Sequence, residues 1–514
     1  MSRGTLIIAA DFGTSSVKLG VVAEGMKLLS RRIESYPVQL GSGGVAEQRP
    51  EEWWAALARG LSHIEADMPG TLSRAGALVF SAQMAGVTCV DRDGVPLRPA
   101  IIWQDIRAAR LARGLIGGFP EALGYNLPRL AKWIRVANGA PAKNGMDPIA
   151  KMHFLMREEP ETWARTYRTL DVKDWLVHRA TGRFVTTGDS ANLTWLMDTR
   201  PGREGWSETL SEMTGTPLDK LPEIVDGCEV VGELTPRAAA ELGLPPDLAV
   251  VAGGGDVTAT ALGSGAVEDG ALHLCISTSA WVSGFFPKRV ISVPHSYATV
   301  ASAAGFRPLL IATQESAGSA LDWVARLMGY GDTPDLAAAY GELGTWRDDD
   351  PFLLPWFAGE RVPVDNDALR GTIYGLSIDH DRQAVARAAI EGVALNLRWA
   401  YDSVAKKRGV QLDGPLPLVG GGAANPELAQ TVADALNREV TTGETRFAGV
   451  LGTAALAAPY MGWDRDVWHA AARLGNRVQT RYAPLPGRRE MLERRYARLR
   501  TLRKRMVKSY GSGA

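Results

Sequence analysis

Short apolar runs bounded by polar turns recur along the chain and predict buried strands. They occupy residues 6–10, 19–23, 77–81 and 87–90 in the first half, and 249–252, 272–276, 309–312 and 416–419 in the second. Helical segments alternate with these runs in both halves. The pattern therefore predicts an α/β fold.

Apolar positions spaced three or four residues apart predict the helices between the strands. Residues 51–66 form one such segment, which follows Pro50 at its start and shares one apolar face: Trp53, Trp54, Leu57, Leu61 and Ile64. Residues 383–408 form the longest, with a four-residue repeat: Val385, Ala389, Val393 and Leu397. Asn425 and Pro426 have the types expected at the N-cap and first position of a further helix.

The segment 488–508 is strongly basic and carries an apolar helical stripe made of Leu492, Tyr496, Leu499, Leu502 and Met506. A basic amphipathic helix can bind a membrane or a nucleic acid, or it can dock on its own protein through the stripe. The balanced charge of the whole chain favours docking. We expect residues 485–514 to be a basic helix and tail packed on the second domain.

The chain of 514 residues is too long for one core, so we expect an N-terminal domain over 1–247 and a C-terminal domain over 248–484. Basic and acidic residues number 57 each, which argues against a nucleic-acid partner. Three widely spaced cysteines fit a reducing compartment, and no apolar stretch is long enough for a signal peptide or membrane span. We expect a cytoplasmic protein with no membrane partner.

Two Thr-Ser turns, each following an apolar run, resemble one another. The first, Asp11-Phe12-Gly13-Thr14-Ser15-Ser16-Val17-Lys18, follows the run 6–10, and the second, Ser277-Thr278-Ser279-Ala280-Trp281, follows the run 272–276. Such turns can direct N–H groups and hydroxyls at one anion, and Asp11 could hold a hydrated magnesium ion. Two turns could thus face one polyphosphate, although an ordinary hairpin explains either turn taken alone.

Three further segments are candidate ligand sites. Gly253-Gly254-Gly255-Asp256 ends in an acid that could accept a hydroxyl proton in phosphoryl transfer, or could cap the following helix. Gly420-Gly421-Gly422 could contact a nucleotide through its bare backbone, or could be a plain tight turn. Trp103 and Asp105 suit a polyhydroxylated ligand, while a structural pair of Asp105 with Arg107 is the alternative.

These segments, in this order, resemble the FGGY family of carbohydrate kinases, and its xylulokinase-like members most closely. The resemblance spans nearly the whole chain and also includes Glu47 to Trp54, Lys173 to Leu176, Gly359 to Pro363 and Ile390 to Gly392. It implies two ribonuclease-H-like domains of the actin and sugar-kinase type around a deep interdomain cleft. It also implies ATP-dependent phosphorylation of a sugar or polyol, most closely a ketopentose such as xylulose or ribulose.

The resemblance implies roles for individual residues and is compatible with a homodimer. Asp256 matches the catalytic base, and Asp11 matches the residue near Mg²⁺. The nucleotide-binding positions are matched by Thr14, Ser15, Thr278, Gly318, Gly421, Gly422 and Asn425. The sugar-binding positions are matched by Met84, Ala85, Trp103, Asp105 and Asp256.

Four positions depart from the xylulokinase pattern: Ala85 replaces a histidine, Val257 an asparagine, Ser277 a glycine and Leu428 a tryptophan. Because a buried pocket that loses polar contacts can change its substrate, the sugar stays open. Another polyol, such as glycerol or an erythritol-like tetritol, or a signalling sugar is an alternative. An actin- or chaperone-like ATPase and a sugar sensor with little kinase activity are alternatives outside sugar metabolism.

Overall fold

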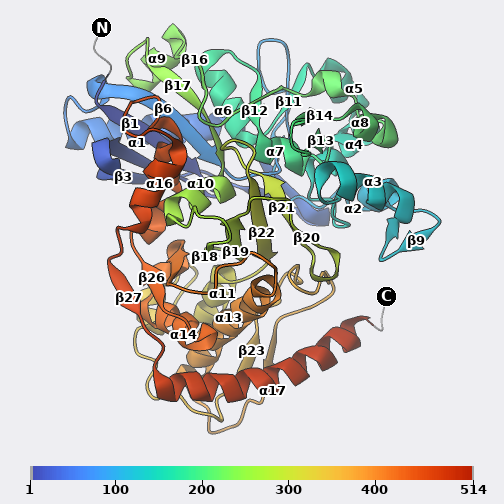
Figure 1. The fold of residues 1–514 in the computed structure, drawn as a ribbon, viewed down its shortest axis with the longest axis vertical. Coiled ribbons are helices and arrows are strands. Elements are labelled where there is room, and N and C mark those ends of the chain that lie inside the picture. The colour runs from blue at the N-terminus through green and yellow to red at the C-terminus, as the bar shows by residue number, and fades with distance from the viewer. Residues whose placement is uncertain (1–3, 512–514) are drawn as a thin grey trace.

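The computed structural model describes residues 4–511, which form two lobes stacked one above the other (Figure 1). Each lobe is built on one β-sheet with helices on both faces. Residues 512–514 of the expected tail lie outside the described part. Within residues 4–511, no helix is long and apolar enough to cross a membrane.

The first lobe contains a six-stranded sheet. In spatial order its strands are β16 (Val230–Glu233), β17 (Ala249–Gly255), β6 (Ala75–Ala82), β1 (Leu6–Phe12), β2 (Ser16–Ala23) and β3 (Lys27–Ser35). The three strands β17, β6 and β1 run parallel, and β2 and β3 continue as an antiparallel meander. The parallel strands therefore end at one common edge, which is where open α/β sheets bind ligands.

Strand β1 is buried on both faces, which explains its unbroken apolar sequence. Leu6 and Ile8 point to the face covered by α1 (Pro50–Asp67) and α6 (Val172–Thr181). Ile7 and Ala9 point to the opposite face, covered by α15 (Ala448–Ala457) and α16 (Val467–Gly475). Two layers of helices thus enclose the first sheet.

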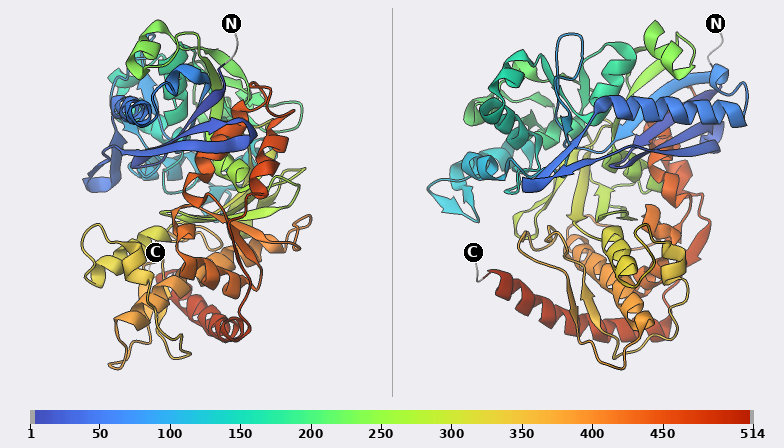
Figure 2. Two further views of the ribbon diagram at one scale, coloured as in Figure 1. Left: turned by 90° about the vertical axis from the view of Figure 1, so that its left-hand side faces the viewer. Right: turned by 180° about the vertical axis from the view of Figure 1, so that it is seen from behind.

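The helices α15 and α16 come from the C-terminal part of the chain, yet they stand beside the strands of the first lobe (Figure 2). Helix α15 also packs closely on α10 (Asp256–Ser264), where a Cβ on Gly263 or Gly452 would clash with the facing helix backbone. Strand β17 belongs to the first sheet as well. The division by sheets therefore differs from the linear one expected at residues 247 and 248, because tertiary pairing returns residues 448–475 to the first lobe.

The second lobe repeats the plan of the first. Its strands in spatial order are β20 (Ile291–Ser292), β21 (Tyr297–Ala301), β22 (Pro308–Gln314), β19 (Ala280–Phe285), β18 (Leu272–Ile276), β25 (Leu416–Val419), β26 (Val440–Thr442) and β27 (Thr480–Tyr482). Strand β18 has an antiparallel hairpin partner on one side and a parallel strand on the other, as β1 does. The two Thr-Ser turns therefore occupy equivalent hairpins.

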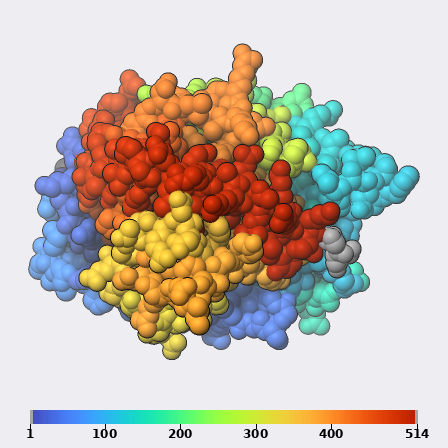
Figure 3. Space-filling model, turned by 90° about the horizontal axis from the view of Figure 1, so that it is seen from below, coloured from blue at the N-terminus to red at the C-terminus, as the bar shows by residue number. Residues whose placement is uncertain are grey.

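The outer face of the second sheet is covered by α11 (Gly318–Leu327), α13 (Arg382–Ala405) and α14 (Pro426–Leu436). Helix α17 (Pro486–Gly511) lies across the lower surface of this lobe (Figure 3). Its side chains Leu492, Tyr496 and Leu499 are buried in the same core. The docked helix expected from the apolar stripe is thus what the structure contains.

Residues 109–165 and 188–214, on either side of α6, form an added region on the first lobe. It contains α2 (Ala109–Ile116), α3 (Leu127–Ala137), α4 (Pro148–Glu158), α5 (Pro160–Arg165), α7 (Gly188–Leu193) and α8 (Glu208–Thr214). This region reaches the second lobe, where the amide of Asn138 donates to the carbonyl and hydroxyl oxygens of Thr299. It therefore closes one side of the space between the lobes.

Candidate active site

The acids expected to be catalytic lie at neighbouring strand ends of the first sheet. Asp11, near the end of β1, pairs in register with Ser81 of β6, and Ser81 pairs with Gly254 of β17. Asp256 follows directly after β17. The fold therefore brings Asp11 and Asp256 to one edge, although 245 positions separate them in the sequence.

Asp11 is held by a short chain of hydroxyls. Ser81 donates a hydrogen bond of 2.8 Å to Asp11 Oδ1, and Thr453 of α15 donates one of 2.7 Å to the Ser81 hydroxyl. A Cβ on Gly449 would clash with the Asp11 carboxylate, so glycine is required where α15 passes. The side chain is fixed on one oxygen and mostly buried.

Asp256 is the first residue of α10, but no side chain caps this helix. The helix-cap role that the sequence left open is therefore not observed. Burial, and after it the negative charge of Asp11, raise the pKa of Asp256 to about 8. A carboxyl group with such a pKa can accept a proton near neutral pH.

The first Thr-Ser turn is held by Gln48 and by Trp103, which is one of the sugar-binding candidates. The Gln48 amide donates to the Thr14 carbonyl at 2.7 Å, and Trp103 Nε1 donates to the Thr14 hydroxyl at 3.0 Å. Because the hydroxyl accepts from Trp103, its own hydrogen remains available to an anion. Ser15 is exposed beside it.

Lys18 ends the first Thr-Ser turn segment, and no separate role was predicted for it. It pairs with Asp11 across the β1–β2 hairpin and is partly buried. Its charge lowers the pKa of Cys275 in β18 of the second lobe, although burial outweighs this and raises that pKa overall. Lys18 therefore faces the space between the lobes, and its register opposite Asp11 was the available signal.

The second Thr-Ser turn is fastened to the start of α11. The amide of Gly318 donates to the Ser277 carbonyl at 2.8 Å, and the amide of Ser319 donates to the Thr278 carbonyl at 3.0 Å. A Cβ on Gly318 would clash with the Ser277 carbonyl. Gly318 and Thr278 are thus brought together, as expected for one binding surface.

The glycine turn after β25 lies beside the same strand end. Gly420 has a φ of +92°, and Cβ atoms on Gly420 and Gly422 would clash with Ile276 of β18. Gly421 differs, since a Cβ there would meet nothing within 4 Å. Asn425 caps α14 by accepting the Leu428 amide at 2.9 Å. Only Gly421 of these glycines leaves open space for a ligand.

A groove of about 510 Å³ runs between the lobes next to this turn. It is lined by Arg31 and Arg32 of β3 on one side, and by Ala424 and Phe447 on the other. Arg31 forms an ion pair of 3.2 Å with Glu444 across it. None of the nucleotide-binding candidates lines this groove; Ala424, directly before Asn425, is the lining residue nearest to them in the sequence.

The turn that carries Met84 and Ala85 lies against the Asp256 turn. A Cβ on Gly255 would clash with the Met84 side chain. Ala85 has a φ of +68°, its amide donates to Asp171 Oδ2 at 3.2 Å, and its carbonyl accepts from Lys151 Nζ at 2.6 Å. Asp171 and Lys151 were not predicted, and they hold the backbone at the position that lacks histidine.

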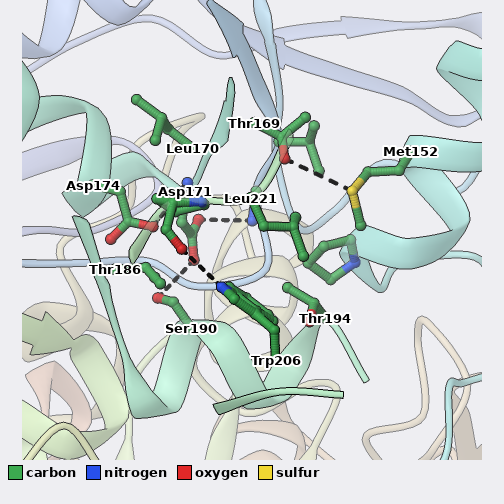
Figure 4. A pocket seen from close by; sticks show the side chains of 14 residues that line it. Met152, Thr169, Leu170, Asp171, Asp174, Thr186, Ser190, Thr194, Trp206 and Leu221 are labelled. Atoms are coloured by element: carbon green, nitrogen blue, oxygen red, sulfur yellow. Dashed lines mark hydrogen bonds between the residues drawn. The ribbon is translucent and has the colours of Figure 1, made fainter. Parts of the chain in front are cut away.

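A small cavity lies behind this turn (Figure 4). Asp171 and Ser190 meet at its wall, where the Ser190 hydroxyl donates to Asp171 Oδ2 at 3.0 Å. Its volume of about 30 Å³ suits a water molecule and is far too small for a sugar. Burial and the neighbouring Asp174 raise the pKa of Asp171 to about 6.

Asp105 is engaged by the protein itself. Its Oδ2 accepts from the Ala46 amide at 2.9 Å, and Oδ1 accepts from the Arg107 amide at 3.0 Å. The Arg107 guanidinium also pairs with it at 2.8 Å, and Glu47 joins this pair. These contacts form the structural Asp–Arg pair, and a sugar-binding role for Asp105 stays a prediction.

A magnesium site needs few protein ligands. Residues 4–511 contain no cluster of three or more His, Cys, Asp or Glu residues placed to hold a metal. Mg²⁺ bound with a nucleotide uses one or two carboxylates and takes its other ligands from phosphates and water. Asp11 offers such an oxygen at the sheet edge, so the residues present fit this ion.

Comparisons with known proteins agree with this geometry. Residues 6–263 match the N-terminal domain of the FGGY family of carbohydrate kinases, and residues 278–461 match its C-terminal domain. The chain belongs to the FGGY family of carbohydrate kinases. This FGGY kinase therefore carries out ATP-dependent phosphorylation of a sugar.

Relatives of this FGGY kinase differ in their substrates. The xylulose kinase of Escherichia coli K12 is 31% identical over 457 residues, covering 88% of this chain and 89% of that protein. The structures of a gluconate kinase and a ligand-bound xylulose kinase, both from Lactobacillus acidophilus, each have a TM-score of 0.84 and 21% identity. Each alignment covers 99% of this chain, with 99% of the gluconate kinase and 100% of the xylulose kinase. These structural matches show the shared fold and do not discriminate between substrates.

Proposed function

We propose that this FGGY kinase transfers the γ-phosphate of Mg·ATP to a hydroxyl of a ketopentose such as xylulose or ribulose, with Asp256 as the general base. The observation that carries the proposal is the common sheet edge. It places Asp11, the Met84 turn and Asp256 side by side, with Thr14 bonded to Trp103 next to them.

ATP would bind between the lobes. Its phosphates would meet the hydroxyl of Thr14, the turn at Ser15 and the turn at Thr278, with Lys18 supplying a positive charge. Its adenosine would lie over Gly421, where the backbone faces open space, near Asn425 and Gly318. This placement agrees with the groove beside Ala424.

Asp11 would hold the magnesium ion, with its carboxylate oriented by Ser81. When bound, the ion neutralises charge on the phosphates. Lys18 and the Thr14 hydroxyl would add to this stabilisation from the protein side. Their contribution is greatest in the transition state, where charge spreads over the transferred group.

Asp256 would accept the proton of the attacking hydroxyl late in the transfer, because the transition state is loose. The raised pKa of Asp256 suits this role, because a carboxylate whose pKa lies near neutral pH is a better proton acceptor than an ordinary aspartate. The buried turn around Met84 would keep water away from the γ-phosphate. We therefore expect little ATP hydrolysis without sugar.

The similarity to the E. coli xylulose kinase supports a ketopentose as the substrate, and the altered residue at position 85 counts against it. Ala85 offers no polar side chain where a histidine is usual, so the sugar contacts must come from the backbone of the turn, from Trp103 and from Asp256. A polyol, a signalling sugar or an aldonic acid such as gluconate is the second candidate. The gluconate kinase of the same fold gives this alternative its weight.

The experiment is ADP release from Mg·ATP with a panel of ketopentoses, pentitols, tetritols, glycerol and gluconate. Wild type is compared with Asp256→Ala and with the matched control Asp413→Ala, which lies in an exposed loop. We expect one sugar to raise the rate many-fold in wild type and the control, but not in Asp256→Ala. Normal turnover by Asp256→Ala would refute the role of Asp256 as the general base. If no sugar raises the rate in wild type, the sensor or ATPase alternatives are favoured.

A further inference from the structure

A fully buried carboxylate lies directly behind the Asp256 turn. Asp189 in α7 has no exposed surface. Its Oδ2 accepts the amide of Gly255 at 2.7 Å and the hydroxyl of Thr258 at 2.6 Å. Asp189 therefore holds the residue before Asp256 and the residue two positions after it.

The orientation of Asp189 is itself fixed. Its Oδ1 accepts the hydroxyl of Thr187 at 2.7 Å and the amide of Ser190 at 3.0 Å. Four donors thus surround the two oxygens, which offsets the cost of burying a charge. Such a satisfied carboxylate is a rigid support rather than a group poised to react.

The same turn is clamped from the second lobe. The amide of Ala303, between β21 and β22, approaches the Thr258 hydroxyl at 3.4 Å. A Cβ on Gly254 would lie 2.8 Å from the Cβ of Ala303. The backbone around Asp256 is therefore enclosed between Asp189 on one side and Ala303 on the other.

We propose that Asp189 is a positioning residue for phosphoryl transfer, because its carboxylate binds the Gly255 amide before Asp256 and the Thr258 hydroxyl after it, and so sets where the base stands at the sheet edge. The inference rests on the function proposed above for Asp256. Asp189 lies in none of the segments quoted for the resemblance and in none of the apolar runs.

Asp189 also acts on Asp256 through its charge. The charged groups that face Asp256 are Asp11 from β1, Asp171 from the start of α6 and Asp189 from α7, and all three raise its pKa. The Cys275 thiol of β18 lies on the side of the second lobe, with Lys18 near it. Removing the charge of Asp189 should lower the pKa of Asp256, whereas a purely structural support would not affect it.

The test combines two variants. Asp189→Asn removes the charge and leaves one side of the amide unable to accept, so we expect kcat to fall roughly ten- to hundred-fold. The acid limb of the pH profile of kcat/KM should also move to lower pH. Thr258→Val keeps the charge of Asp189 but removes the hydroxyl that donates to Asp189 and accepts from the Ala303 amide, so kcat should fall while the acid limb stays in place.

Thr260→Val is the matched control, since Thr260 stands about 200° around the axis of α10 from Thr258. Wild-type kcat in Thr258→Val, or a fall in Asp189→Asn without movement of its acid limb, would overturn the inference. If Asp189→Asn fails to fold, Thr258→Val decides the matter alone. Activity in Asp256→Ala would instead refute the proposed base, which separates the two failures.

Discussion

The indole N–H of Trp103 donates a hydrogen bond of 3.0 Å to the hydroxyl of Thr14. The bond joins the segment assigned to sugar binding with the turn assigned to phosphate binding. It also orients the hydroxyl, because a group that accepts on one lone pair directs its hydrogen elsewhere. The place where the hydroxyl of the sugar meets the γ-phosphate should therefore lie beside this bond.

Trp103→Phe keeps an aromatic ring but removes the donor. We expect kcat/KM for ATP to fall roughly three- to ten-fold, since one hydrogen bond contributes about 1 kcal/mol. Thr14→Val should cost more, and the double variant should cost less than the sum of both. Steady-state kinetics measures this, with Trp54→Phe as a control on α1. Additive effects would contradict the coupling.

The pH dependence of the reaction should follow Asp256. Its carboxyl has a pKa of about 8 and must be ionised to accept a proton. We therefore expect kcat/KM for Mg·ATP to fall as pH drops below about 8, with the acid limb reporting the free enzyme. A profile that stays flat down to about pH 4, the usual range of an aspartate, would argue against the raised pKa.

Asp256→Asn should be more stable than wild type at alkaline pH. Between pH 3.8, the ordinary pKa, and about 8 the folded state binds a proton that the unfolded state has lost. The stability of wild type therefore declines as pH rises through this window, whereas asparagine has no such loss. We expect Tm to be about 2–4 °C higher at pH 8.5, with a smaller gap at pH 5. Thermal unfolding of Asp256→Asn beside Asp413→Asn checks this, and an equal gap at both pH values would disprove it.

Gly421→Val should impair nucleotide binding without harming the fold. A side chain there enters open space beside the proposed adenosine site, whereas Gly422→Ala would collide with Ile276 and lower stability. We expect KM for ATP to rise in Gly421→Val while Tm stays close to wild type. Gly114→Val is the matched control, because Gly114 also faces open space but lies on α2. Unchanged ATP affinity would place the adenosine elsewhere.

The strands were predictable because they are buried. Each of the eight apolar runs is a strand in the structure, and the run 416–419 coincides with β25. Parallel strands covered on both faces cannot alternate apolar and polar residues, so they appear as continuous runs. Short edge strands such as β27 (Thr480–Tyr482) carry no such signal and were not predicted.

The lobe to which α15 belongs could not be predicted. All residues of α15 are buried and apolar or small, so no polar face shows which sheet the helix covers. Its glycines allow close packing against Asp11 and α10, but that contact is visible only in three dimensions. A boundary drawn along the sequence therefore misses the return of the chain.

The site residues that belong to sequence motifs could be predicted, whereas those that act as buried supports could not. Asp11, Thr14 and Asp256 lie at turns after apolar runs, which marked them. Asp189 and Lys151 are fully buried charges whose role depends on donors and acceptors from distant segments. No local pattern distinguishes such residues from ordinary surface charges.

The position of α15 between the sheets has a consequence for synthesis on the ribosome. When residues 1–255 have emerged, all six strands of the first sheet exist, but the face that carries Ile7 and Ala9 has no cover. That cover arrives only after residue 457 has been translated. The nascent chain must therefore keep an apolar surface from aggregating through about two fifths of its elongation. A chain that ends before this helix would be an aggregation-prone fragment rather than a folded lobe.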